Sequence, residues 1–212
     1  RECLLWLHQG VWLACCVAPV AMGLTWFVYG TLDHWGLHPE THRLVGPYMR
    51  VIAFSALPLL LYASFRRYLQ GMHLVRPIMI ALVTANVINA AANWVLIYGN
   101  LGMPALGVAG SAWATNAARV YMAAFLYAAI RLEHHGRGHR HPKVSLRFDA
   151  ARIRRLIGLG FPAASQVALE VGVFALATAL AGRLDPVSSG SHQIALNIAS
   201  LAFMVPLGLA SA

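Results

Sequence analysis

The sequence predicts an all-α membrane protein with six transmembrane helices, and three observations support this fold class. Of its 212 residues, 59% are hydrophobic and only 11% are charged, whereas soluble domains carry roughly 45–50% apolar and about 25% charged residues. The mean hydropathy is +0.62. The charged residues gather between long apolar segments. Such a chain cannot cover a soluble surface of its own, which excludes a soluble enzyme, a disordered chain and a collagen-like chain.

The six predicted helices are apolar segments that hold almost no charge. Each is close to or longer than the roughly 17–25 residues that cross a bilayer as a helix. They are apolar around most of their circumference, unlike the amphipathic helices of soluble proteins. None alternates between polar and apolar residues as a barrel strand does. The segments are 11–29, 48–65, 77–98, 105–130, 156–182 and 187–209.

The connecting segments predict the orientation of these helices. If the helices alternate in direction, the N-terminal end and the loops 66–76 and 131–155 share one side, and they hold most of the 16 basic residues. This is the positive-inside pattern, which predicts that these parts are cytoplasmic in a multi-pass protein of the cell inner membrane. The net charge of +9 therefore marks topology, so we expect the lipid bilayer and not nucleic acid as the partner.

Cysteine and histidine do not predict a metal site. Cys3, Cys15 and Cys16 lie in or beside the first apolar segment without the spacing of a zinc site. Four histidines stand in the polar loop, interleaved with arginine and glycine and without paired carboxylates: His134, His135, His139 and His141. We interpret this tract as a solvated basic linker, with a specific metal site as the weaker alternative. No cofactor is predicted.

Polar side chains at helical spacing lie within three of the apolar segments. In the third, Asn86, Asn89 and Asn93 are spaced i, i+3, i+7 and so share one face. The fourth segment carries Thr115, Asn116 and Arg119, and the sixth carries Gln193 and Asn197. Each of these residues could simply join two helices. Together they predict a polar cavity that they line.

Two arginines lie within or at the edge of the apolar segments. Arg119 is too deep in the fourth segment to reach the membrane surface. It would pair with a carboxylate or line a water-filled cavity. Arg50 lies near the outer boundary of the second segment, where anchoring at the interface is the simple explanation.

The fifth segment contains the one acidic residue found inside any of the six. Glu170 lies next to the midpoint of residues 156–182. A carboxylate at that depth is costly, so such residues usually face a cavity and mark a proton or ion pathway. The alternative is a structural carboxyl hydrogen-bonded to another helix. Gln166 shares the face of Glu170, and Pro162 is predicted to permit bending of the helix.

The chain divides best at its polar loop. We predict four N-terminal helices within residues 1–132, a basic cytoplasmic linker over 133–155, and two further helices within 156–212. The chain starts Arg-Glu-Cys and ends in an apolar run, so we expect an internal piece of a longer polypeptide whose remaining helices complete it.

Five sequence segments resemble the multidrug and toxic compound extrusion (MATE) family, in its NorM-like branch. They occur in the family's order and spacing. They are RRYLQGMHLVRP at 66–77, NVINAAANWVLIYG at 86–99, PALGVAGSAWAT at 104–115, GLGFP at 158–162 followed by Glu170, and HQIA at 192–195 followed by Asn197, Phe203, Met204 and Pro206.

The resemblance implies that the chain corresponds to helices three to eight of a twelve-helix, two-lobed antiporter. Such an antiporter exports cationic, amphipathic drugs in exchange for H⁺ or Na⁺ by alternating access, and is expected to be a monomer when complete. Glu170 matches the carboxylate associated with ion coupling and substrate charge. Asn89, Asn93 and Thr115 match polar positions near a first-helix aspartate outside this chain.

Two other functional classes stay open. A lipid-linked oligosaccharide flippase of the wider superfamily would share the helices, but it should favour a cavity with several basic residues, and only Arg119 suggests one. An integral-membrane enzyme would need a cluster of catalytic residues at a membrane face. The histidine tract lacks acidic partners, so an enzyme is not predicted.

Overall fold

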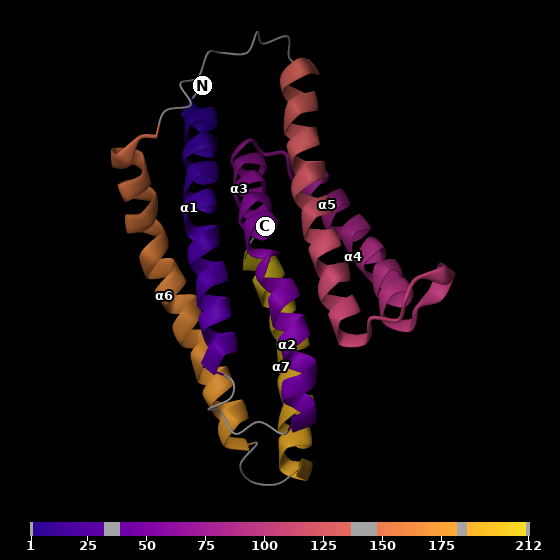
Figure 1. Ribbon diagram of the computed structural model, residues 1–212. Coiled ribbons are helices and arrows are strands. Elements are labelled where there is room, and N and C mark those ends of the chain that lie inside the picture. Colours follow the sequence, from indigo (N-terminus) through magenta and orange to yellow (C-terminus); the bar gives the residue numbers. More distant parts are fainter. Residues whose placement is uncertain (1, 32–38, 137–147, 182–185, 211–212) are drawn as a thin grey trace. The chain divides into compact units, whose positions relative to one another are not determined.

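A computed structural model describes residues 2–31, 39–136, 148–181 and 186–210 of the chain. Within these ranges the regular structure is helical, without a strand, as predicted. Figure 1 shows the elements in chain order: α1 (Glu2–Thr31), α2 (Pro39–Ala53), α3 (Ala56–Gly71), α4 (Val75–Tyr98), the short 3₁₀ helix η2 (Asn100–Gly102), α5 (Gly107–Gly136), α6 (Ala150–Ala181) and α7 (Pro186–Ala210).

Three of these helices are long and apolar enough to cross a membrane by length and composition. They are Glu2–Thr31, Val75–Tyr98 and Ala150–Thr178, which contain the first and third predicted segments and most of the fifth. A fourth span is possible if α2 and α3 are taken together. The fourth and sixth predicted segments form as α5 and α7. Among the described residues these two do not qualify as spans on composition alone, so a count of six spans stays a prediction.

The second predicted helix, 48–65, is broken in two. The pair Val45–Ala53 and Ala56–Gly71 is bent by 45°. The sequence explains the position of the break, because Pro58 lacks the N–H that would bond the carbonyl of Phe54, and its ring crowds that carbonyl. The break comes within one turn before the proline.

The connection between α4 and α5 is a close hairpin. Gly99 ends α4 with φ +75°, and a Cβ at this position would meet the backbone N of Ala105 at 2.9 Å. Leu106 N–H then bonds the Leu96 carbonyl at 2.9 Å. A Cβ on Gly110 would lie 2.4 Å from the Leu96 carbonyl oxygen. The glycines therefore allow two helix backbones to approach closely, as small residues do in membrane bundles.

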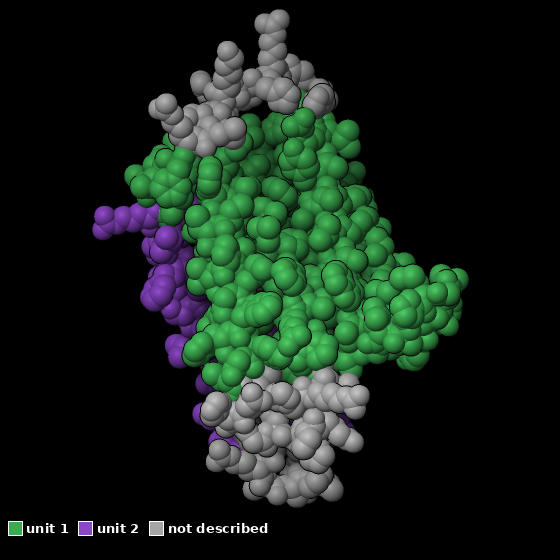
Figure 2. Space-filling view, in the orientation of Figure 1, with its two compact units in different colours: residues 1–153 green, residues 154–212 purple. Residues whose placement is uncertain are grey.

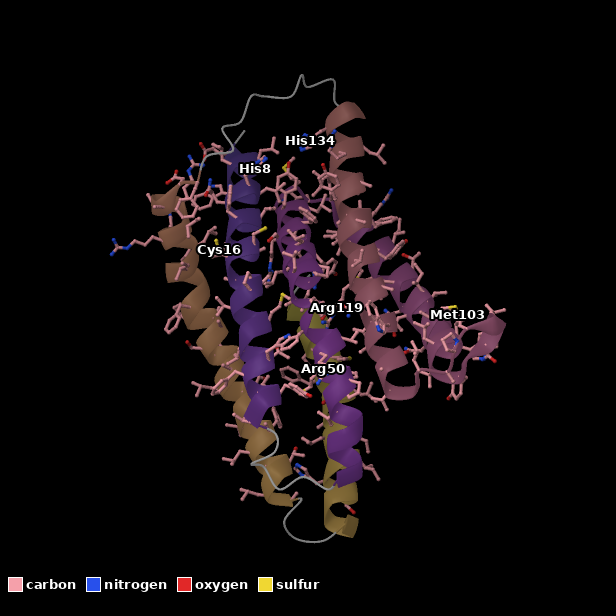
Figure 3. All side chains as sticks on the ribbon, in the orientation of Figure 1. His8, Cys16, Arg50, Met103, Arg119 and His134 are labelled. Carbon is pink, nitrogen blue, oxygen red and sulfur yellow. The ribbon has the colours of Figure 1, made fainter. Side chains whose placement is uncertain are left out.

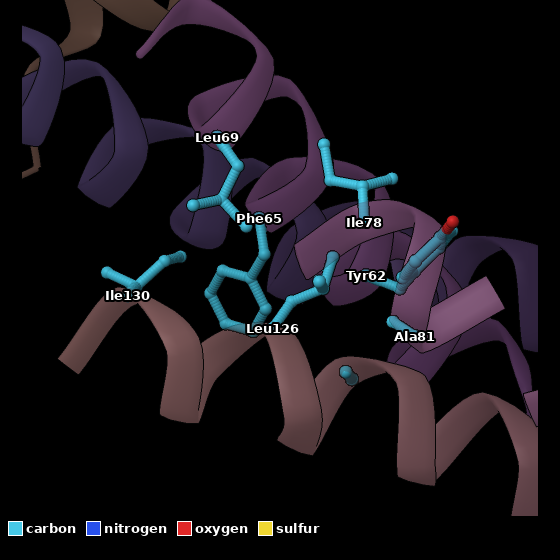
Figure 4. Close-up of a cluster of buried hydrophobic side chains, with 8 residues drawn as sticks. Tyr62, Phe65, Leu69, Ile78, Ala81, Leu126 and Ile130 are labelled. Atoms are coloured by element: carbon cyan, nitrogen blue, oxygen red, sulfur yellow. The ribbon is translucent and has the colours of Figure 1, made fainter. Parts of the chain in front are cut away.

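The core of the N-terminal helices lies between α3, α4 and α5. In Figure 4, side chains of α3 and α4 meet side chains of α5. α5 packs against α2, α3 and α4, and α1 packs against α2 and α3. The buried cluster consists of Tyr62, Phe65, Leu69, Ile78, Ala81, Ala123, Leu126 and Ile130.

The chain separates into two compact units, Arg1–Ile153 and Arg154–Ala212, coloured in Figure 2. The predicted linker 133–155 is shorter than expected, because α5 continues to Gly136 and α6 begins at Ala150. Residues 137–147 lie outside the described part. The carboxylate of Asp149 accepts the N–H groups of Ala151 and Arg152 at 3.0 and 3.2 Å, which explains why α6 begins there.

Candidate functional site

The asparagine face of α4 is only partly joined by its own hydrogen bonds. Asn93 Nδ2 donates to Asn89 Oδ1 at 3.1 Å, so these two amides form one polar patch. The Asn93 Oδ1 atom is buried and accepts no hydrogen bond from the described residues. Asn86 is exposed and bonds only the Leu82 carbonyl of its own helix, at 3.0 Å. The structure therefore pairs Asn89 with Asn93 and leaves Asn86 apart from them.

Two neighbouring polar residues of α5 have different roles. Thr115 Oγ1 donates to the Ser111 carbonyl of its own helix at 2.9 Å. Asn116 is buried, with 8% of its surface exposed, and its Nδ2 donates to the Val51 carbonyl of α2 at 2.7 Å. Sequence analysis noted Asn116 but did not predict this contact. The signal was its i, i+3 spacing from Arg119.

Arg119 contacts the break between α2 and α3. Its Nη1 donates to the hydroxyl of Ser55, which is 1% exposed. Figure 3 labels Arg119 within the N-terminal unit. Among the described residues no carboxylate pairs with it. We expected a carboxylate or a cavity at this position, and Ser55 is the partner that the structure gives.

Arg50 lies on a separate part of the same unit, labelled in Figure 3. Its Nη2 donates to Tyr29 Oη at 2.7 Å, and its guanidinium carbon lies 5.1 Å from the centre of the Tyr29 ring. This exposed pair joins the ends of α1 and α2. An aromatic and a cationic side chain together are typical of a membrane interface.

The predicted site residues of the second unit lie on exposed surface. Glu170 and Gln166 of α6, and Gln193 and Asn197 of α7, are all exposed. Within the described part of the chain, Glu170 forms no hydrogen bond or ion pair. A carboxylate in the middle of a 29-residue apolar helix is costly against lipid, so we expect polar surroundings for it. The structure does not join these four residues to one another.

Pro162 lies inside α6, which continues as one helix from Ala150 to Ala181. The proline removes the donor that would bond the carbonyl of Gly158. No side chain or backbone atom lies within 4 Å of a Cβ built on Gly158 or Gly160. The predicted bending at this position stays a prediction.

One end of the N-terminal unit gathers exposed arginines. Arg66 and Arg67 close α3, Arg76 opens α4, and Arg131 lies near the end of α5. Tyr68 and His134 connect these ends, with Oη and Nε2 3.1 Å apart. Of the histidine tract, His139 and His141 lie outside the described residues, as does the middle of the loop 131–155, residues 137–147.

Sequence analysis did not predict the anchor that fixes the start of α6 to α1. Gln9 is 1% exposed, and its Oε1 accepts the N–H of Asp149 at 3.1 Å. Arg152 lies 3.1 Å from the carboxylate of Asp149, 3.7 Å from that of Glu2, and 5.5 Å from the centre of the Trp6 ring. The glutamine at position 9, within an apolar helix, was the signal in the sequence. It could not identify its partner, because Asp149 is 140 residues away along the chain.

A shallow pocket of about 380 Å³ borders this anchor, within the N-terminal unit. Leu5, Gln9 and Phe148 line it with residues 149–152. It lies at the helix ends, far from the asparagines of α4 along the chain, and we assign no ligand to it.

Comparison with known proteins identifies the family. The MatE family model matches residues 6–95. The probable multidrug resistance protein NorM of Mesorhizobium japonicum is 36% identical over 203 residues, covering 96% of this chain and 44% of that protein. Proteins of the same name from Rhizobium meliloti and Geobacillus kaustophilus are each 31% identical, over 97% of this chain and 44% and 45% of their own lengths.

The chain thus spans less than half the length of these curated relatives. Its alignment to them covers both compact units, and the family model covers α1 to α4. The long apolar helices agree with a membrane protein. The chain belongs to the MATE family and is NorM-like.

Proposed function

We propose that the complete protein exports cationic, amphipathic drugs or other toxic organic compounds across the cell inner membrane, coupled to entry of H⁺ or Na⁺. The NorM relatives are named as probable multidrug resistance proteins. The charge and the polar groups within the helices of this chain support the same activity here.

Glu170 carries this proposal. It is an exposed carboxylate within a helix long and apolar enough to span a membrane. A carboxylate in that position attracts one cation at a time. A proton or Na⁺ at Glu170 therefore weakens the binding of a cationic drug, either by direct competition or through a change of conformation. Exchange of ion for drug requires this mutual exclusion. Gln166, Gln193 and Asn197 supply uncharged polar contacts on α6 and α7.

The paired amides of α4 support a second polar region in the N-terminal unit. The free Oδ1 of Asn93 is an acceptor that suits a proton donor or a cation. Asn89 holds the Asn93 amide in place. Thr115 belongs to this region as a cavity-lining residue in the proposal, whereas Asn86, which is exposed and apart from the pair, is left out of it. Two polar regions in two lobes suit alternating access, in which the lobes move about a central cavity.

The topology in the proposal places the arginine-rich helix ends in the cytoplasm. Arg66, Arg67, Arg76 and Arg131 share one end of the N-terminal unit, which is the arrangement that the positive-inside rule associates with the cytoplasmic face. We infer a multi-pass protein that acts as a monomer and needs no cofactor besides the coupling ion.

The oligosaccharide flippase is a weaker alternative. It rested on Arg119 as a basic group lining a cavity. Arg119 instead bonds Ser55 at the break between two helices, which gives this arginine a structural partner. One basic residue with such a partner gives little support to a cavity for anionic diphosphate-linked sugars.

The test of the proposed function is Glu170→Gln in the complete protein, produced in a host that lacks its own drug pumps. Efflux of ethidium is expected to fall to the background of the empty host, because the amide can neither bind a proton nor attract a cation. Glu133→Gln, at the end of α5, serves as the matched control and should keep efflux. Unchanged efflux by Glu170→Gln would remove Glu170 from the mechanism.

A further inference from the structure

The break between α2 and α3 lies in the middle of an apolar segment, where backbone groups need partners. Water is absent from the hydrocarbon core, so each unsatisfied N–H or C=O group there is costly. Pro58 removes one helical hydrogen bond from this segment. Two residues at the break are nevertheless buried, since Ala53 is 3% exposed and Ser55 is 1% exposed, whereas the side chain of Phe54 between them is 58% exposed.

Before the proline, the local backbone forms a tight turn. Phe54 N–H bonds the Val51 carbonyl at 3.3 Å, and Ser55 N–H bonds the Ile52 carbonyl at 3.0 Å. Both bonds run from residue i to i−3, as in a tightened turn. The Ser55 hydroxyl adds a bond to the Ile52 carbonyl at 2.6 Å. The chain thus turns at Phe54 and Ser55, and α3 resumes at Ala56.

Two side chains of α5 add hydrogen bonds at this turn. Asn116 Nδ2 bonds the Val51 carbonyl at 2.7 Å, and Arg119 donates to the Ser55 hydroxyl. These two residues are three apart and therefore share one face of α5. Both contacts bridge more than 60 residues of sequence, with separations of 65 and 64.

Three threonine hydroxyl groups of the unit donate within their own helices, whereas the Ser64 hydroxyl also reaches the Gly10 carbonyl of α1 at 3.3 Å. Thr25 Oγ1, Thr84 Oγ1 and Thr115 Oγ1 donate to carbonyls three or four residues earlier in their own helices. That pattern is ordinary for polar side chains in helices and needs no special site. Asn116 and Arg119 instead act on another helix, at the one place where its backbone pattern is interrupted.

We propose that Asn116 and Arg119 are positioning residues that hold α2 and α3 at a fixed angle. In this arrangement the break is a rigid elbow: α5 adds hydrogen bonds to residues on both sides of the turn, at Val51 and Ser55, and α2, α3 and α5 move as one body. The hydrogen bond to Ser55 thereby accounts for an arginine deep within an apolar segment. The inference concerns the shape of the N-terminal unit and does not depend on the transported compound.

The elbow can be tested by pulsed electron spin resonance on the complete protein in lipid nanodiscs. Every native cysteine, including the exposed Cys3, Cys15 and Cys16, is replaced by serine. Spin labels are attached at Met49→Cys in α2 and Arg67→Cys in α3. With wild-type Asn116 and Arg119, we expect one narrow distance distribution.

Asn116→Leu and Arg119→Gln should each broaden this distribution and shift its mean, because the elbow loses a donor from α5. Thr115→Val is the matched control and should leave the distribution unchanged, since Thr115 bonds only its own helix. Pro58→Ala restores the N–H donor for the Phe54 carbonyl and so favours one continuous helix. Adding it to Asn116→Leu should therefore narrow the distribution again, at a longer separation.

Two results would overturn the inference. In the first, both α5 variants keep the wild-type distribution, so the angle is set without them. In the second, both variants fail to accumulate and Pro58→Ala does not recover them, so the two residues serve general packing. Because distances are measured and not efflux, neither result depends on whether the protein exports drugs.

Discussion

Gly110 shows how a single residue can control the fit of two helices. A Cβ at this position would lie 2.4 Å from the Leu96 carbonyl oxygen and 2.7 Å from its carbon. These atoms belong to the backbone of α4, which cannot rotate away as a flexible side chain can. The alternation of small residues before it along α5 was visible in the sequence, but which glycine touches the partner was not.

We therefore predict that Gly110→Ala destabilises the protein. The forced separation of α4 and α5 should cost about 1–3 kcal/mol, as other overpacked sites do. The temperature at which the detergent-solubilised protein aggregates should fall by several degrees. Gly23→Ala in α1 is the control, because a Cβ there meets nothing within 4 Å. Equal stability of the two variants would contradict the close contact.

Asn93 and Asn86 offer a second contrast between single residues. Their spacing in the sequence made them equivalent, whereas the structure buries the Asn93 Oδ1 atom without a partner among the described residues and exposes Asn86. Periodicity identifies a helix face, but it cannot tell which members of that face meet a neighbouring helix.

Asn93→Leu should accordingly reduce drug efflux by the complete protein about tenfold, which corresponds to the loss of roughly 1.5 kcal/mol from one hydrogen bond to a charged group. Asn86→Leu should leave efflux close to normal, because its amide bonds only its own helix. The measurement is initial efflux rate at matched expression. A larger loss for Asn86→Leu than for Asn93→Leu would reverse the assignment.

Among the elements, α6 depends most on a contact distant in sequence. Its first turn is held by Asp149, whose N–H bonds Gln9 of α1. The apolar segment from residue 156 predicted the helix itself, but its true beginning at Ala150 depends on a cap and on this anchor. The break in the second predicted helix is similar. Pro58 was visible in the sequence, whereas Asn116 and Arg119 of α5, which stabilise the break, could not be identified as its partners.

Gln9→Leu should loosen the first turn of α6. A buried N–H left without an acceptor costs about 1–3 kcal/mol, so the amides of residues 149–153 should exchange with deuterium faster. His8→Ala is the control on the neighbouring position, because His8 Nδ1 contacts only the Leu4 carbonyl of its own helix. Unchanged exchange in Gln9→Leu would show that the other anchor contacts are sufficient.

At the scale of the whole molecule, composition alone predicted the helical membrane class and the apolar segments that became α1, α4 and α6. It could not settle the span of α5, because this helix carries enough small and polar residues to lower its hydropathy. Some of these residues pack against or bond a neighbouring helix, as Gly110 and Asn116 do. A hydropathy scale records only their low hydrophobicity and not these contacts.

The topology predicts which loops a membrane-impermeant thiol reagent can reach. In a cysteine-free background, Leu101→Cys in the turn between α4 and α5 should react in intact cells, since Leu101 is 81% exposed. Arg67→Cys and Arg131→Cys should react only after the membrane is opened, because the positive-inside pattern predicts that the basic ends face the cytoplasm. Labelling of Arg67→Cys in intact cells would invert the topology.

The most direct test of ion-coupled drug export uses the complete protein purified into sealed liposomes that enclose DNA. The fluorescence of ethidium bound to this DNA reports how much ethidium is inside. We predict that an imposed gradient of H⁺ or Na⁺ drives ethidium across the membrane in the direction opposite to the ion. This movement should stop when the gradient is collapsed, and it should be absent in Glu170→Gln. Transport that continues without either gradient, or that persists in Glu170→Gln, would contradict coupling through this carboxylate.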